Sequence, residues 1–418
     1  MRVKHIFLVP LLFGTFLHAR TLTLQESIQS TLAHHPDVKR FMLNIQQAEQ
    51  GYNATFADYL PQLDLSATYS PTQTYVLPTN GTFNTIDDDG WNAGVSLHQK
   101  VWDFGKTGSL VEASRIDTDI SKLSLHEVKA LLAFKVKSLY ELMLVQKEAV
   151  RVREKDLEAK KAFYEQTLAM VKQGMKTKAD ANRFLSAVYA AKDALAIAQA
   201  SYNKARNSLS LYMGKKIPEN ITLQKKALKT HAKIPYNIVD TVLTANTKLK
   251  MDHLAVNKGE QLHKSARAVQ FGSIDLVASH NRFGTLNTYN TDYVGVGYNV
   301  PLYTGGRLSA EEQKAKIAYQ MAREQQASDE LALKEEVQNL LIDIKRYDTS
   351  IQAKRAQFKS AQSTQRKVEA RYKEGLATYI EVLDNTAVML NAQLGVLEAY
   401  YLRALAFDRI AYLKGEIR

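Results

Sequence analysis

The feature that most constrains this chain is an internal duplication. Gly94 and Gly295 lie 201 positions apart, and so do Gly174 and Gly375, with no gap needed between these landmarks. Further upstream, LPQLDLSAT from Leu60 matches FGSIDLVAS at an offset of 211, so the first copy carries ten more residues between its strand candidates. Such a repeat predicts one elongated structure built from two equivalent halves, rather than two or three unrelated domains.

Each half contains two stretches with the alternating hydrophobicity of β-strands. Leu63, Leu65 and Ala67 share one face, while Asp64 and Ser66 share the other. We predict strands at 62–76, 91–103, 272–283 and 292–303, with a polar loop over 71–90. These lengths approach the roughly 9–11 residues of a tilted membrane strand. Aromatic residues lie towards the strand ends, as in interfacial girdles, although ordinary strand propensity also explains several of them: Tyr69, Tyr75, Trp91, Trp102, Tyr289, Tyr293 and Tyr303.

Helical patterns occupy the rest of each half. We predict a first helix over 24–59 and 238–270, a long helix over 105–172 and 306–373, and a return helix over 175–213 and 378–414. Apolar residues recur every seven positions at Val136, Met143, Val150, Leu157, Tyr164 and Val171, at Val337, Ile344, Ile351, Phe358 and Tyr372 with Gln365 as a polar break, and at Val188, Leu195, Tyr202 and Leu209. Sustained heptads indicate coiled-coil packing.

The expected organisation follows from these elements. Residues 1–19 have the basic, apolar and small-residue order of a signal peptide. The first repeat then covers 20–220, a linker covers 221–235, and the second repeat covers 236–418. The predicted fold class is mainly α with a small β part, internally duplicated.

Composition excludes several classes of protein. There is no cysteine, which excludes disulfides, thiolate metal sites, catalytic thiols and a lipid anchor on an N-terminal cysteine. The formal net charge is +12, but basic residues alternate with acidic ones, so we expect no nucleic-acid partner. No metal-ligand spacing or phosphate loop occurs. We therefore expect no catalytic residues, metal or cofactor, and the chain is not predicted to be an enzyme.

After the signal peptide, no stretch reaches the roughly 18 apolar residues of a transmembrane helix. Any membrane crossing must therefore use the strands. Four strands cannot close a barrel, and open strand edges do not occur in lipid. Three chains would supply twelve strands, an even number within the range of outer-membrane barrels. The alternative is a coiled-coil structural or adhesive surface protein on a β anchor.

Taken together, these elements resemble the TolC family of outer-membrane efflux proteins over nearly the whole mature chain. The resemblance rests on LTLQESIQSTLAHHPDV, LPQLDLS, the VWDFGK and VPLYTGGR junctions and two glycine turns. It implies a homotrimer with a twelve-stranded barrel in the outer membrane of a Gram-negative bacterium and a periplasmic α-barrel made of helical hairpins. It also implies an exit duct of a tripartite efflux or type I secretion system, with a periplasmic adaptor and an inner-membrane pump of RND or ABC type. The sequence does not identify the transported substrate.

The resemblance implies two acidic rings at the pore entrance, Glu381 and Asp384. The residues alone favour another role for Glu381, because Thr378 and Glu381 form a capping box at a helix start. The cap does not require Asp384. Tyr372 and Asp180 match a family contact that keeps the entrance closed; equally, Tyr372 fits a heptad core and Asp180 a first-turn acid.

The resemblance also places the two hairpin turns against the adaptor. The turn residues concerned are Gly174, Met175, Thr177, Gly375, Leu376 and Thr378. The resemblance implies two further contacts that keep the entrance closed, and each lacks one residue in this sequence. Ala377 stands where an arginine is usual. Phe163 stands where the family has a polar partner for Glu369. We expect the closed state to be held differently.

Overall fold

The computed structural model describes residues 21–224 and 234–417, with the side chain of Thr79 excepted. The predicted signal peptide and most of the predicted linker lie outside these residues. The chain divides into two compact units, and each combines pieces of both repeats. The helical unit comprises 21–36, 129–224, 234–238 and 337–417, and the strand unit comprises 37–128 and 239–336.

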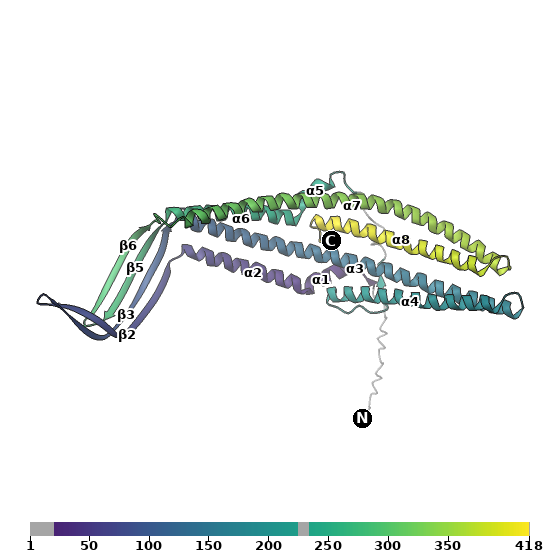
Figure 1. The fold of residues 1–418 in the computed structure, drawn as a ribbon, viewed down its shortest axis with the longest axis horizontal. Helices are drawn as coiled ribbons and strands as arrows, with labels where there is room; N and C mark the ends of the chain where they lie inside the picture. Colours follow the sequence, from purple (N-terminus) through teal and green to yellow (C-terminus); the bar gives the residue numbers. More distant parts are fainter. Residues whose placement is uncertain (1–20, 225–233, 418) are drawn as a thin grey trace, which may run out of the picture. The chain divides into compact units, whose positions relative to one another are not determined.

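The helical unit is a bundle of long helices. It contains α1 (Leu24–His34), α4 (Lys178–Met213), α8 (Tyr379–Leu413) and the later parts of α3 (Lys106–Lys172) and α7 (Arg307–Lys373). Two short strands, β1 (Thr21–Leu22) and β4 (Thr222–Leu223), pair in parallel beside it. Figure 1 shows α3 with α4, and α7 with α8, as antiparallel hairpins. The mainly helical fold class is confirmed.

The heptad predictions differ in outcome between helices. In α7, Val337, Ile344, Ile351 and Tyr372 are all buried, and the polar break Gln365 is buried with them. In α4, the most buried heptad is a different one, Phe184, Ala191, Ala198 and Ala205. The predicted Val188, Leu195 and Tyr202 are half-buried beside it. The small alanines of this heptad let α4 approach its neighbours closely, as its alanine-rich sequence predicts.

The strand unit contains the helices next to a four-stranded sheet. They are α2 (Pro36–Phe56), α5 (Ile238–Ala245), α6 (Thr247–Ala268) and the first parts of α3 and α7. The predicted first helix of each repeat is wrong as a single element, because each is broken. Pro36 lacks an N–H and starts α2 after α1 ends at His34. Asn246 caps α6 by accepting from the Leu249 N–H at 3.0 Å.

The sheet has the antiparallel order β2-β3-β5-β6, formed by β2 (Gln62–Thr79), β3 (Thr82–Trp102), β5 (Ser273–Gly284) and β6 (Thr288–Asn299) (Figure 1). The predicted polar loop over 71–90 is wrong, because these residues continue the β2–β3 hairpin. The turn is only Asn80-Gly81, with φ of 49° and 80°, which fits the favoured Asn-Gly turn. The fourth strand begins and ends four residues earlier than predicted, and it ends before Pro301, which cannot donate to a ladder.

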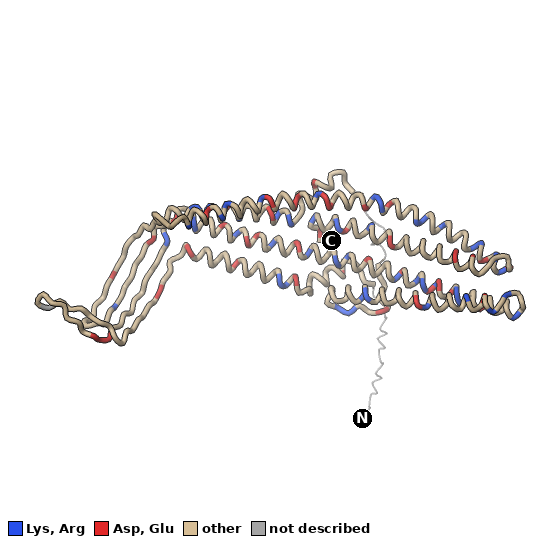
Figure 2. Tube along the Cα trace, viewed as in Figure 1, with Lys and Arg blue, Asp and Glu red and all other residues tan. Residues whose placement is uncertain are grey.

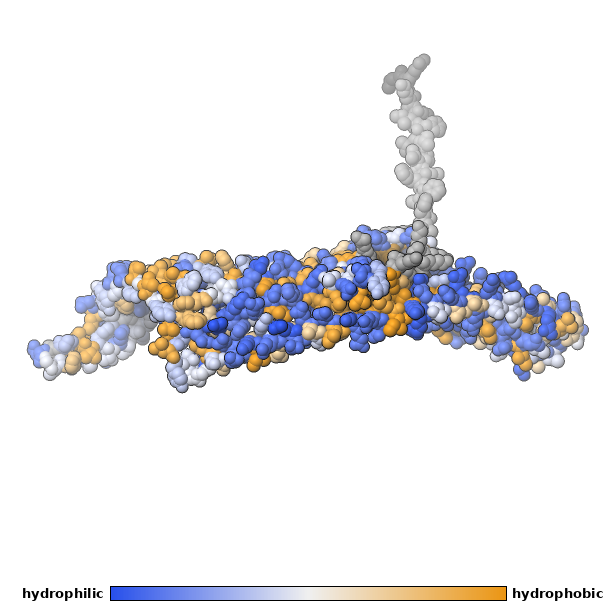
Figure 3. All heavy atoms as spheres, turned by 90° about the horizontal axis from the view of Figure 1, so that it is seen from above, coloured by the Kyte–Doolittle hydropathy of each residue, from blue (hydrophilic) through white to orange (hydrophobic). Residues whose placement is uncertain are grey.

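One face of the sheet is apolar, as the alternation predicted. Leu63 pairs with Leu97 and Leu65 with Val95 across β2 and β3. Leu65 is 80% exposed and Val95 39% exposed, and Figure 3 shows apolar side chains on the surface of the strands. The sheet therefore presents apolar side chains outward rather than to a core.

The apolar band shifts along the strands from one side of the sheet to the other. At the register of Val95, β5 and β6 carry the polar pair His280 and Asp292 on the same face. Their apolar residues lie nearer the helices, where Leu276 pairs with Val296. The apolar band is therefore displaced along the strands between the β2–β3 and β5–β6 pairs. Among the described residues, no helix is both long and apolar enough to cross a membrane.

Candidate functional site at the hairpin turns

The two hairpins of the helical unit end in turns with the same construction. Gly174 and Gly375 have φ of 74° and 77°, the left-handed region that glycine adopts without strain. The N–H of Met175 donates to the Met170 carbonyl at 2.9 Å, and that of Leu376 to the Arg371 carbonyl at 2.8 Å. Both helices thus end in a Schellman motif. Met175 and Leu376 are exposed, at 60% and 64%, so each turn presents one apolar side chain.

The next helix starts in both hairpins with a capping box. Thr177 and Asp180 form the first box, in which the Thr177 N–H donates to the Asp180 carboxylate at 3.0 Å. Thr378 and Glu381 form the second, with the corresponding distance 3.2 Å. Asp180 and Glu381 therefore act as helix caps in this structure. The backbone hydrogen bond from Thr177 lowers the pKa of Asp180.

The two acids predicted to line an entrance lie on the first turns of α8. Glu381 caps the helix through Oε1, while its Oε2 is 4.0 Å from Arg371. Asp384 is exposed, and within the described part of the chain no hydrogen bond or ion pair to it is recorded. Glu381 therefore caps a helix, whereas Asp384 does not. The Asp384 carboxylate is available to solvent or to a ligand.

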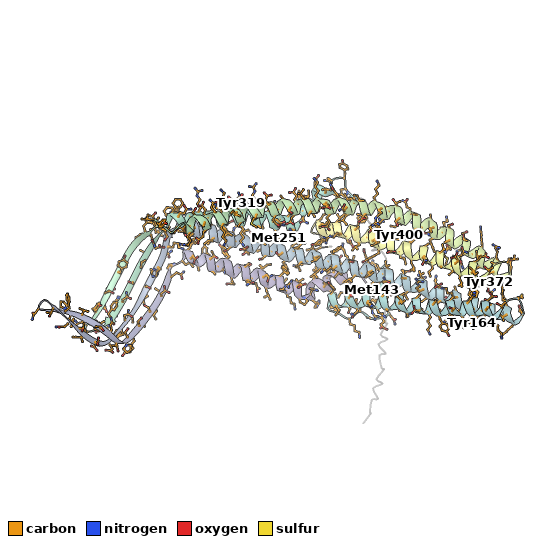
Figure 4. All side chains as sticks on the ribbon, viewed as in Figure 1. Met143, Tyr164, Met251, Tyr319, Tyr372 and Tyr400 are labelled. Atoms are coloured by element: carbon orange, nitrogen blue, oxygen red, sulfur yellow. The ribbon has the colours of Figure 1, made fainter. Side chains whose placement is uncertain are left out.

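Tyr372 lies in an aromatic cluster where the two hairpins meet (Figure 4). The cluster is formed by Phe163 of α3, Phe184 of α4, Tyr372 of α7 and Val382 of α8, all buried. The Phe184 and Tyr372 ring centroids are 5.6 Å apart and the planes are inclined by 66°, an edge-to-face packing. Inside the cluster, the Tyr372 hydroxyl lies 2.8 Å from Thr167 Oγ1.

The structure does not bring Tyr372 and Asp180 into a hydrogen bond. The hydroxyl of Tyr372 bonds Thr167, and the carboxylate of Asp180 bonds Thr177. The two residues are close enough to interact electrostatically. Burial, with the charge of Asp180 as a smaller contribution, raises the pKa of Tyr372, and the Thr167 hydrogen bond opposes this.

Several other residues build this site, and only some of them were named in the sequence analysis. Phe163 occupies the aromatic cluster, and Ala377 is buried beside it. Gln365 donates to Thr386 at 2.7 Å and to Glu369 at 2.9 Å, so it joins α7 to α8. Thr167, Phe184 and Thr386 were not predicted. Phe184 lies on a heptad of α4 whose other buried members are alanines, and the two threonines are polar, so a search for large apolar residues at heptad spacing does not find them.

Charge is distributed along the helices without a concentrated basic patch (Figure 2). Within the described ranges, no group of three or more His, Asp or Glu side chains is arranged to hold a metal ion.

Comparisons with known proteins agree with this architecture. The chain is 23% identical to the outer membrane protein TolC of Escherichia coli (strain K12), over 94% of this chain and 83% of TolC. It is also 23% identical to the cation efflux system protein CusC of the same strain, over 90% of this chain and 82% of CusC.

Solved structures share the fold. A CusC structure superposes with a TM-score of 0.85 at 20% identity, covering 98% of this chain and 97% of that chain. The open state of the Neisseria gonorrhoeae MtrE outer membrane channel gives 0.81 at 21% identity, over 94% and 89%. The family described as outer membrane efflux protein matches residues 27–215 and 238–416, which include both repeats and both hairpin turns. This chain therefore belongs to the outer membrane efflux protein family.

Proposed function

We propose that three copies of this outer-membrane efflux channel complete a twelve-stranded barrel, which continues into a periplasmic α-barrel. The channel acts as the passive exit of a tripartite system, downstream of an inner-membrane pump of RND or ABC type and a periplasmic adaptor. The single observation that carries the proposal is the open four-stranded sheet. Its outer strands, β2 and β6, each pair on one side only within the chain, and its apolar face points outward. A sheet with unpaired edges in lipid requires neighbours.

The hairpin turns are the proposed adaptor contact. Each turn places an exposed apolar residue, Met175 or Leu376, beside a left-handed glycine. The half-buried Lys176 and the exposed Lys373 lie near these residues in the chain. A single exposed apolar residue is ordinary on a protein surface, so the proposal rests on the same arrangement recurring in both turns. Gly174, Thr177, Gly375 and Thr378 set the conformation of this surface.

Glu381 and Asp384 are the proposed acidic rings of the entrance. Three copies of Asp384 would form a ring of free carboxylates, and Glu381 would add its second oxygen while capping α8. Such rings attract cations into a pore. Tyr372 and Asp180 are the proposed gate contact, in which Tyr372 holds the two hairpins together within the aromatic cluster.

Single-channel conductance in planar bilayers tests the proposal. We expect the purified protein to conduct, and a trivalent cation on the periplasmic side to block it. Glu381→Gln with Asp384→Asn should abolish the block, because the charges are removed while glutamine still completes the capping box. Glu374→Gln is the matched control, since Glu374 is an exposed acid at the same turn.

The outcomes separate the parts of the proposal. Well-folded oligomers without conductance would contradict the duct and favour a coiled-coil surface protein. Conductance with a block that survives the double substitution would retain the duct and leave Glu381 only as a cap.

A further inference from the structure

Two acids and one lysine are buried together in the helical unit, away from the hairpin turns. Glu141 and Lys137 lie one turn apart on α3, and Asp408 faces them from α8. Glu141 is only 3% exposed. The side chains of Lys137 and Asp408 are 16% and 13% exposed, and Lys137 Nζ lies 3.3 Å from Asp408 Oδ1. The site is complete within one chain.

One cation cannot neutralise two buried carboxylates. Glu141 Oε2 and Asp408 Oδ2 are both buried, and neither accepts a hydrogen bond from a donor among the described residues. An unpaired charge in such a place is strongly unfavourable, whereas a neutral carboxylic acid can donate its O–H to a neighbouring carboxylate. Glu141 and Asp408 are close enough to interact as hydrogen-bonding groups.

The other charged groups nearby are already engaged. Arg403 of α8 lies 2.7 Å from Asp348 of α7, and Arg409 of α8 packs over Phe134 and Tyr412. Next to the site, the Ser138 and Tyr401 hydroxyls are 3.2 Å apart. Lys137 is thus the one cation seen to act on the pair among the described residues.

We infer that Glu141 and Asp408 form a proton-binding site, in which one bound proton is shared between the two carboxyls and holds α3 against α8. The proton sits on one carboxyl oxygen and is donated to the other residue, while Lys137 balances the remaining charge. Because α3 belongs to the first repeat and α8 to the second, this proton joins the two repeats.

The titration of the pair agrees with this geometry. Burial, then the charge of Asp408, raises the pKa of Glu141 to about 9, with Lys137 opposing them. Burial also raises the pKa of Asp408. A raised carboxyl pKa means that the folded state holds a proton which the unfolded or separated state releases. The contribution to stability is complete below the ordinary glutamate value of 4.5, and it decreases with rising pH until about 9.

This linkage makes the α3–α8 contact sensitive to pH. A movement that separates the helices hydrates both carboxyls and releases the proton. Each unit of pH increase across that interval should favour the separated state about tenfold. A rise in pH from about 4.5 to about 9 would therefore loosen the connection between the repeats, and a fall in pH over the same interval would strengthen it.

Infrared titration of the full-length protein in detergent tests the inference. A protonated carboxylic acid has a C=O stretch distinct from that of a carboxylate. We expect the wild type to show this band at neutral pH and to lose it as the pH passes about 9. Glu141→Gln should remove the band, because the amide is a neutral mimic of the protonated acid. Glu158→Gln, an exposed acid on the same helix, should leave it unchanged.

Thermal unfolding against pH provides the second measurement. The loss of stability between about pH 4.5 and 9 should be reduced in Glu141→Gln and in Asp408→Asn, and retained in Glu158→Gln. Absence of the acid band in the wild type at neutral pH would overturn the inference, whether or not the variants fold. Stability that follows the sodium or potassium concentration rather than pH would also overturn it, since a metal cation would then occupy the site. Neither readout depends on the channel's partners.

Discussion

At the scale of single residues, the contact between Thr167 and Tyr372 is the most consequential in the hairpin region. Both side chains are completely buried, and their hydroxyls are 2.8 Å apart. A buried hydroxyl that loses its only partner retains the cost of desolvation, whereas removing both hydroxyls leaves nothing unpaired. The contact connects α3 to α7, hence one hairpin to the other.

We predict that Thr167→Val lowers the free energy of unfolding by about 1–3 kcal/mol, because it leaves the Tyr372 hydroxyl unsatisfied. Tyr372→Phe should cost less, since Thr167 can still donate to the Phe163 carbonyl at 2.7 Å. The double variant should be less destabilised than the sum of the two. A double-mutant cycle measured by denaturant unfolding gives the coupling. Additive losses would show that the two hydroxyls do not act together.

The sequence could identify Tyr372 but not its partner. Tyr372 continues a heptad that starts at Val337, so its burial follows from periodicity. Its partner could not be read from the sequence, because Asp180 and Thr167 both lie within reach on the first hairpin. Asp180 is drawn instead to the backbone N–H of Thr177. Whether Asp180 bonds the nearby Thr177 N–H or the distant Tyr372 hydroxyl depends on the three-dimensional geometry, which the sequence does not show.

At the scale of elements, the hairpin turns depend on glycines in a conformation that other residues rarely adopt. A Cβ added at Gly375 would meet nothing within 4 Å, yet φ is +77°. The whole effect of a substitution is therefore backbone strain. Gly51 in α2 is a suitable comparison. Its surroundings are equally open, but its φ is not positive, so alanine there causes no backbone strain.

We predict that Gly375→Ala destabilises the protein by about 1–2 kcal/mol, the cost of the left-handed conformation for an L-residue. Gly51→Ala should stabilise it by about 0.5–1 kcal/mol, because glycine is a poor residue in a helix interior. Unfolding midpoints of the two variants, which carry the same chemical change, check both signs. Equal shifts in the same direction would show that the turn tolerates a side chain.

The elements most accessible to sequence analysis were the long helices and the glycine turns. Their boundaries, Lys106–Lys172 and Arg307–Lys373, lie within a residue of the prediction, because a long heptad ended by glycine is unambiguous. The hairpin between β2 and β3 was less accessible. Its polar residues over 71–90 suggested a loop, yet exposed strands need no apolar face, and Thr74 bonds Asp87 across the hairpin at 2.6 Å.

At the scale of the whole molecule, the edge strands of the four-stranded sheet require pairing partners from other chains. Leu65 on β2 and Val296 on β6 lie on edge strands and are 80% and 68% exposed. Two strands, β3 and β5, lie between them. At about 4.8 Å per strand spacing, the two positions are at least about 14 Å apart within one chain. A disulfide requires Cα atoms within about 7 Å, so it cannot form between them intramolecularly.

The chain has no cysteine, so introduced cysteines report only on the designed contact. We predict that Leu65→Cys combined with Val294→Cys, Val296→Cys or Tyr298→Cys, in at least one of these registers, produces disulfide-linked species on a denaturing gel that stop at three chains. The series should end at three chains if β6 of each protomer pairs with β2 of the next, because a ring of twelve strands then closes. Each single-cysteine variant serves as the control and should give no trimer. A ladder that extends past three chains would exclude the closed trimer, because edge pairing would then propagate without closing.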